Sequence, residues 1–313
     1  MNDRERRYSR LLWVYPARYR SERGDEILAT LLEASSDGRI AFARDTVDIV
    51  MHGTQVRLGL SADRFAGRVL TLAALPGLMM AAALSIVMFV FGELLPIVTH
   101  GPIALRFGPF WTIGPLVYLV WLLGASGALL WPRHRRPLAI ICVLTTVAAI
   151  PVGNVFFARP NLWELLLLVG LGLPAVLAPG TARGRYTRVL AAGVGLLTLA
   201  LLWLLEVTLA PAGLGWFPSF YWWGTWRMGH DMPYIGGVVI AVVCILLVVR
   251  QVDAAGAVAI LSMPFLMASA AYPYERSVAN SLSVIAAAAL AAWFVIHWIL
   301  DLKRLRTQHV SSA

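Results

Sequence analysis

Apolar runs of membrane-spanning length dominate the chain from residue 69 onward. The first run, residues 69–91, contains 23 residues without a charge, and a helix of about 20 residues crosses the roughly 30 Å hydrocarbon core of a bilayer. Further runs lie near residues 111–131, 138–157, 162–178, 188–210, 233–250, 254–272 and 278–300. The pattern predicts an all-α polytopic membrane protein with about eight transmembrane helices. Seven is the competing count, because one of these runs is short and another is weakly apolar.

A polar, arginine-rich segment precedes the first run and predicts a small helical domain of three or four helices. A first helix is expected over residues 4–13, and Pro16 favours the start of a second helix beside it. Gly24 followed by Asp25 leaves open whether that second helix continues or breaks and restarts. The core of this small domain is expected to contain Tyr15, Tyr19, Leu28, Leu31 and Leu32. A third helix is expected over residues 40–60, with an apolar stripe at Ile40, Ala43, Val47, Val50, Met51 and Leu58.

Composition and charge place this organisation in a membrane. Hydrophobic residues make up 59% of the chain and charged residues 14%, against about 25% charged in soluble domains, which excludes a soluble multidomain enzyme. With the first segment inside, 22 of the 26 lysines and arginines lie on the cytoplasmic side. This bias follows the positive-inside rule and accounts for the net charge of +9 without nucleic acid. We expect a cytoplasmic head (residues 1–67), a membrane body (68–302) and a cytoplasmic tail (303–313), with both termini cytoplasmic.

The head carries an aromatic, proline and arginine motif. It reads RLLWVYPARYR over residues 10–20 and is followed by GDEIL at 24–28 and LLEA at 31–34. This pattern resembles the LYPxxYRxxxGxEML opening of certain bacterial membrane proteins. These include permease prefix domains of transporter-like proteins and helical domains of actinobacterial membrane proteins that accompany PadR-type transcriptional regulators. The resemblance implies a regulatory or signalling component of the bacterial cytoplasmic membrane whose head binds a soluble regulator, and the alternative is a transporter or transporter subunit.

Charges in the head favour a protein partner over a direct nucleic-acid partner. Arginines alternate with acidic residues throughout the head, so no single face has the clustered positive charge that phosphate binding needs. The expected partner-binding residues are Tyr15, Pro16, Arg18, Tyr19, Arg20, Arg23 and Glu26. A plain solvated bundle beside the membrane is the competing interpretation.

Carboxylates are rare in the body and gather near the outer ends of the predicted spans. Placing an ionisable group within a bilayer costs free energy, so such a residue suggests a functional role. Simple interfacial placement is one interpretation, and a shared outer pocket is the other. The pocket would contain Glu93, Glu164, Glu206, Arg227, His230 and Asp231. The aromatic segment 211–232 lies on the same side, either embedded at the bilayer surface or acting as a lid.

No catalytic, cofactor or metal site is expected. Cys142 and Cys244 fall inside predicted spans without disulfide or zinc spacing. The GASG sequence at residues 124–127 is similar to the Gly-x-Ser-Gly sequence of rhomboid proteases, but no matching histidine pattern accompanies it. Small residues let helices approach closely, so we expect a helix-packing interface there.

Overall fold

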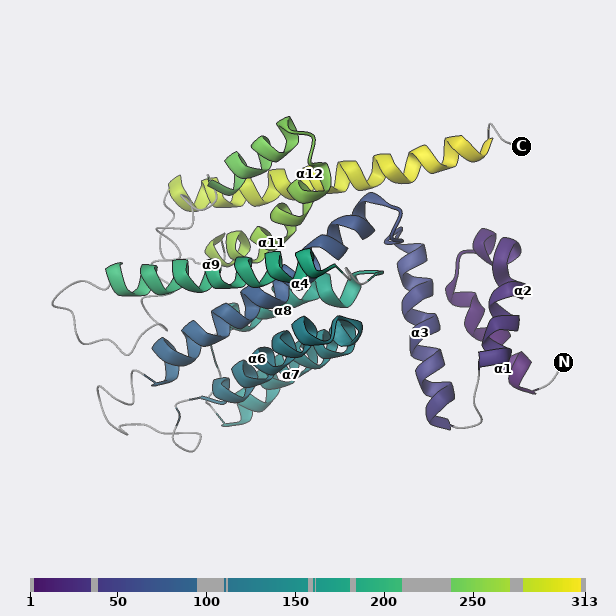
Figure 1. Ribbon diagram of the computed structural model, residues 1–313, viewed down its shortest axis with the longest axis horizontal. Coiled ribbons are helices and arrows are strands. Elements are labelled where there is room, and N and C mark those ends of the chain that lie inside the picture. Colours follow the sequence, from purple (N-terminus) through teal and green to yellow (C-terminus); the bar gives the residue numbers. More distant parts are fainter. Residues whose placement is uncertain are drawn as a thin grey trace. The chain divides into compact units, whose positions relative to one another are not determined.

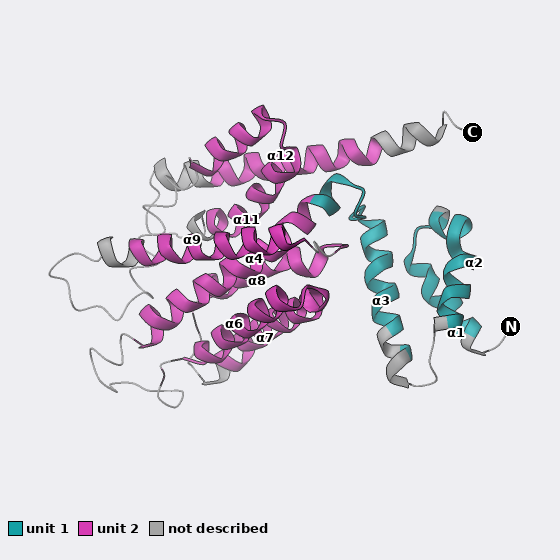
Figure 2. Cartoon of the chain, in the orientation of Figure 1, with its two compact units in different colours: residues 1–68 teal, residues 69–313 magenta. Residues whose placement is uncertain are grey.

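The computed structural model is helical throughout the part of the chain that it describes (Figure 1). The described residues are 3–34, 39–94, 110, 112–156, 160, 162–180, 184–209, 238–270 and 278–310. No strand occurs among them. The chain divides into two compact units, Met1–Arg68 and Val69–Ala313 (Figure 2). Each unit is described by itself.

Before α4 begins, the described residues of the first unit, the head, form three α-helices and one 3-10 helix. They are α1 (Asp3–Leu11), η1 (Leu12–Val14), α2 (Ala17–Ala34) and α3 (Arg39–Arg57). Tyr15 separates η1 from α2 in an extended conformation (φ −77°, ψ 151°), as steric contact with a following proline favours. Of the two alternatives at Gly24, the continuous helix is correct, because α2 passes through this residue without a break.

Four buried side chains form the centre of the hydrophobic core of the head: Tyr8, Leu12, Tyr15 and Ile49. Partly buried side chains of α1, α2 and α3 pack against them, and these are Leu11, Tyr19, Ile27, Leu28, Leu31, Leu32, Phe42 and Val56. The expected contribution of Tyr15, Tyr19, Leu28, Leu31 and Leu32 to the core is therefore confirmed. The Tyr8 hydroxyl also donates a hydrogen bond to Asp45 Oδ2 at 2.8 Å, which ties α1 to α3.

Three of the expected apolar positions of the third helix, Val47, Val50 and Leu58, are exposed, Met51 is partly buried, and the side chains of Ile40 and Ala43 lie outside the described residues. Val47 and Val50 are 56% and 39% exposed, whereas Ile49 is 4% exposed. Leu58, just beyond the helix, is also exposed. The physical reason is that α3 is apolar on two sides, and the side with Phe42, Ile49 and Val56 is the one that meets α1 and α2. The prediction of a third helix was correct, and the structure adds that the side with Ile49 is the buried one.

The second unit, the body, is built from apolar helices. Its helices are α4 (Phe65–Val87, beginning at the end of the first unit), the π-helix η2 (Met88–Leu94), α6 (Gly114–Leu130), η3 (Pro132–His134), α7 (Arg135–Phe156), α8 (Leu162–Leu177), α9 (Arg185–Leu209), the segment Val238–Val248, α11 (Val252–Ala270) and α12 (Val278–Val310). Four stretches are long and apolar enough to cross a membrane: Phe65–Leu94, Pro132–Gly153, Arg185–Leu204 and Val284–Lys303. The other apolar helices among the described residues are shorter: Gly114–Leu130, Leu162–Leu177, Val238–Val248 and Val252–Met267.

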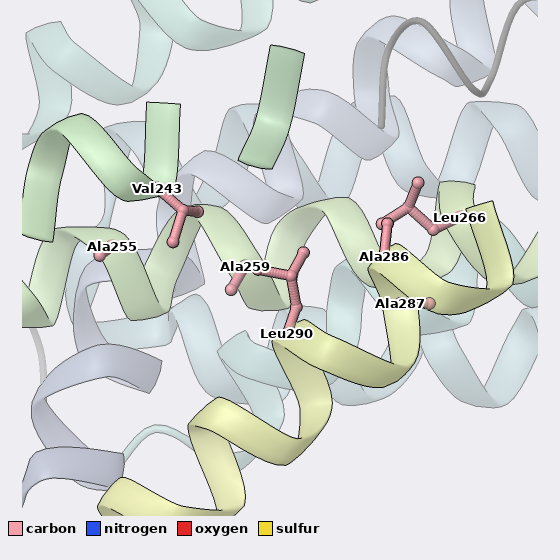
Figure 3. Packing of buried hydrophobic residues seen from close by; sticks show 7 residues of the cluster. All are labelled: Val243, Ala255, Ala259, Leu266, Ala286, Ala287 and Leu290. Atoms are coloured by element: carbon pink, nitrogen blue, oxygen red, sulfur yellow. The ribbon is translucent and has the colours of Figure 1, made fainter. Parts of the chain in front are cut away.

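Small residues bring the helices of the body close together. A Cβ added at Gly170 of α8 would lie 2.7 Å from Pro264 Cγ of α11. A cluster of mostly small buried residues joins α11, α12 and the segment 238–248 (Figure 3). Between α6 and α7, Gly124 abuts Cys142 Sγ, and a Cβ at Gly127 would lie 2.9 Å from Leu138 Cδ1. The expected packing role of the GASG sequence is therefore confirmed.

Large apolar side chains cover the outward faces of the body. On α9 the exposed ones are Val189, Leu190, Leu196, Leu197, Leu201 and Leu204. Large exposed apolar surface is rare on soluble monomers, and the hydrocarbon of a bilayer would solvate it. The described helices are therefore compatible with a membrane protein.

Prolines occupy two kinds of position in these helices. Pro76, Pro151, Pro174 and Pro264 lie inside helices, as the apolar runs predict. Pro115 instead lies in the first turn of α6, where the missing N–H would have no partner within the helix. Pro115 therefore lies at the start of α6 and does not interrupt this helix.

Candidate functional site

The first candidate site is the corner of the head where η1 turns into α2. Tyr15 stacks on Tyr19 with ring centroids 5.2 Å apart, and His52 of α3 meets Tyr15 edge-on at 5.7 Å. Tyr15 is 3% exposed, so it supports the corner from within the core. Burial and the neighbouring Tyr19 raise the pKa of the Tyr15 hydroxyl to about 12. The phenol consequently stays neutral across the physiological pH range.

An exposed cation–π pair lies on the same corner. The Arg20 guanidinium carbon is 4.1 Å from the ring centroid of Trp13, and Trp13 is 67% exposed. Arg57 Nη2 of α3 donates a hydrogen bond to the Trp13 carbonyl oxygen at 2.6 Å, which fixes the backbone that presents the ring. Exposed pairs of this type contribute about 0.5–1 kcal/mol. Trp13 was missed by the sequence reasoning, although its place in the RLLWVYP stretch was the available signal.

The remaining predicted partner-binding residues lie around this corner. Arg23 and Glu26 are exposed on α2, and Pro16 is half-buried at its start. The side chain of Arg18 lies outside the described residues. The structure thus presents Arg20, Arg23 and Glu26 as available charges, and their role in binding stays a prediction.

The second candidate site is a buried polar cluster in the body. Glu93 lies in η2, a π-helix at the end of α4, and is 0% exposed. Its carboxylate accepts hydrogen bonds from the hydroxyl of Thr112 and, at 3.2 Å, from the Thr112 backbone N–H. The backbone N–H of Gly114 donates to Thr112 Oγ1 at 2.8 Å. Single π-helical turns occur frequently at functional sites.

Glu164 approaches the same cluster from α8. It is 1% exposed, and Tyr118 of α6 donates a hydrogen bond to its Oε2 at 3.4 Å. A Cβ added at Gly114 would lie 2.9 Å from Tyr118 Cε2 and 3.0 Å from Glu93 Oε1, so the tyrosine ring and the first carboxylate flank one glycine. Both carboxylates are buried within the body, and the choice between interfacial placement and a shared outer pocket stays a prediction.

The other predicted members of the outer pocket cannot be placed. The side chain of Glu206, together with Arg227, His230, Asp231 and the aromatic segment 211–232, lies outside the described residues. The pocket as a whole, and the choice between an embedded segment and a lid, therefore stay predictions.

Further polar contacts in the body are structural in character. Trp121 Nε1 donates to Thr146 Oγ1 at 2.8 Å, and that hydroxyl donates to the Cys142 carbonyl at 2.8 Å. Over the described part of the chain, no group of three or more His, Cys, Asp or Glu residues could hold a metal ion.

Comparison with protein-family models, with curated proteins and with solved structures finds no match for this chain.

Proposed function

We propose that this chain is a membrane-anchored adaptor of the bacterial cytoplasmic membrane. In this proposal the body crosses the bilayer about eight times, both termini are cytoplasmic, and the head binds a soluble regulatory protein. The resemblance of the RLLWVYPARYR stretch suggests a PadR-type transcriptional regulator as that partner. The four long apolar helices and the four shorter ones support the membrane location.

The exposed face of α3 is the observation that carries the partner-binding proposal. Val47, Val50 and Leu58 remain exposed after the head has buried its own core. Exposed apolar groups that gather on one face mark interaction sites more often than isolated ones do. The exposed Trp13 adds an aromatic anchor of the kind enriched in binding hot spots.

Charges on α2 would contribute to the choice of partner. Arg20 and Arg23 lie three residues apart on α2 and therefore share one side of the helix. They favour an acidic protein surface, and nearby Glu26 limits purely electrostatic binding to nucleic acid.

Co-purification from bacterial cells tests this proposal with the full-length chain. Val50→Asp places a charge on the exposed face of α3, and Ala29→Asp places the same charge on an exposed position of α2. Wild type and Ala29→Asp should retain a soluble regulator, and Val50→Asp should retain about tenfold less, because a buried valine contributes about 1.5–3 kcal/mol. Equal retention by all three proteins would contradict the use of this face.

A transporter is the second candidate, and the buried carboxylates favour it. Glu93 and Glu164 are enclosed in an apolar body where ionisable groups cost several kcal/mol and are usually functional. Proteoliposomes that contain a pH-sensitive dye would detect proton flux. A flux that Glu93→Gln and Glu164→Gln abolish, and Thr146→Val preserves, would support transport. Absence of flux over a panel of substrates would favour the adaptor.

A further inference from the structure

A buried arginine begins helix α7. Arg135 is 3% exposed although it follows the exposed Arg133 and His134 and precedes Arg136. One of its terminal nitrogens, Nη2, donates a hydrogen bond to the carbonyl oxygen of Gly180, which follows α8. Its Nε–H is buried and has no hydrogen-bond partner among the described residues. An arginine carries five N–H donors, so this guanidinium keeps donors beyond the one that Gly180 engages.

Among the described residues, no carboxylate pairs with this charge. Between Glu93 and Glu206 the sequence contains one acidic residue, Glu164. Glu164 lies in the first turn of α8, and Gly180 follows the last turn of the same helix. The two lie at opposite ends of α8, so Glu164 cannot neutralise Arg135. A buried cation without a paired anion is costly, which favours an anion from outside the chain.

Space for such an anion exists beside Gly180. A Cβ added at this glycine would meet no atom within 4 Å. Among the described residues, the glycine whose carbonyl binds Arg135 therefore has open space beside its Cα. Trp131, which follows α6 and precedes Arg133 by two residues, is exposed, and tryptophan is enriched at the level of the lipid headgroups.

We propose that Arg133, Arg135 and Arg136 bind the phosphate group of an anionic phospholipid at the Gly180 end of α8. This inference rests on the membrane location in the proposed function. The planar guanidinium presents paired N–H donors that match phosphate oxygens. Gly180 orients the Arg135 side chain, and the exposed Arg133 adds positive charge at the entrance. Basic pockets between helices near the cytoplasmic surface are known to recognise acidic headgroups.

Lipid titration of the full-length protein in uncharged detergent tests the site. Native mass spectrometry measures binding of phosphatidylglycerol and of phosphatidylcholine. Wild type should prefer phosphatidylglycerol, and Arg135→Gln should weaken that binding about fivefold. Arg133→Gln changes an exposed side chain, leaves the fold intact and should weaken binding to a similar degree. Lys303→Gln removes the same charge from an exposed position on α12 and should leave binding unchanged within about twofold.

Three results would overturn the proposal. The first is equal affinity for both lipids, and the second is that Lys303→Gln weakens phosphatidylglycerol binding as much as Arg135→Gln does. The third is complete displacement of phosphatidylglycerol by inorganic phosphate, which would make the site one for free phosphate. Flotation of the same protein with phosphatidylcholine vesicles tests the membrane location separately. A protein that floats but lacks lipid preference contradicts the site alone, and a protein that does not float contradicts the membrane location.

Discussion

Truncation of Ile49 should destabilise the head strongly, whereas truncation of its near neighbour Val47 should not. Ile49 is buried among Tyr8, Leu12 and Tyr15, and replacement of a buried isoleucine by alanine costs about 2–5 kcal/mol. A domain of fewer than about 80 residues rarely has more than about 3–5 kcal/mol of stability. Ile49→Ala should therefore remove about half of the head's stability or more. Val47 is mostly exposed, and surface changes usually stay within about 0.5 kcal/mol.

Amide hydrogen exchange of the full-length protein in detergent measures this difference. Exchange in α1–α3 reports the free energy of opening of the head. Ile49→Ala should accelerate exchange in these helices about 30-fold or more, which corresponds to about 2 kcal/mol. Val47→Ala should accelerate it about twofold or less. Exchange in α7 of the body serves as the internal control and should not change. Similar acceleration by both variants would refute the assignment of the two faces of α3.

Two further predictions concern the body and the head. Gly124→Ala places a methyl group against Cys142 between α6 and α7, whereas Gly193→Ala on α9 places it in open space. Overpacking costs about 1–3 kcal/mol, so a thermal-shift assay in detergent should show a lower melting temperature for Gly124→Ala and an equal or higher one for Gly193→Ala. For Tyr15, the pKa is raised from 10 to about 12, so the folded head binds a proton that the unfolded chain releases in this interval. Head stability should be fully present below pH 10 and fall as the pH rises towards 12, and Tyr15→Phe should reduce that fall; an equal fall in the variant would exclude Tyr15 as the source.

Helix positions could be predicted from the sequence because apolar runs and proline restrict local structure. The runs near 111–131 and 162–178 contain α6 and α8, and the start of α2 beside Pro16 follows from the backbone restriction at that residue. The buried face of α3 could not be predicted from the sequence. Ile49 and Val47 are both β-branched and apolar, so periodicity alone could not say which one meets Tyr8 and Tyr15.

The candidate sites depended on contacts between distant segments. Glu93 and Glu164 were recognised as unusual carboxylates, but their burial is produced by Thr112 and Tyr118, which come from another part of the chain. Arg135 looked like an ordinary cytoplasmic charge. Its contact with Gly180 spans 45 residues, and no local pattern reveals a contact of that length.

Photo-crosslinking in living cells tests whether the exposed face of α3 contacts a soluble regulator. A photoreactive amino acid replaces Val47 on that face or, as the matched control, Ala29 on α2, in the full-length chain. The probe at Val47 should crosslink to one soluble regulatory protein, and the probe at Ala29 should not. Crosslinks from Val47 only to lipid, or only to residues 69–313 of the same chain, would contradict this contact.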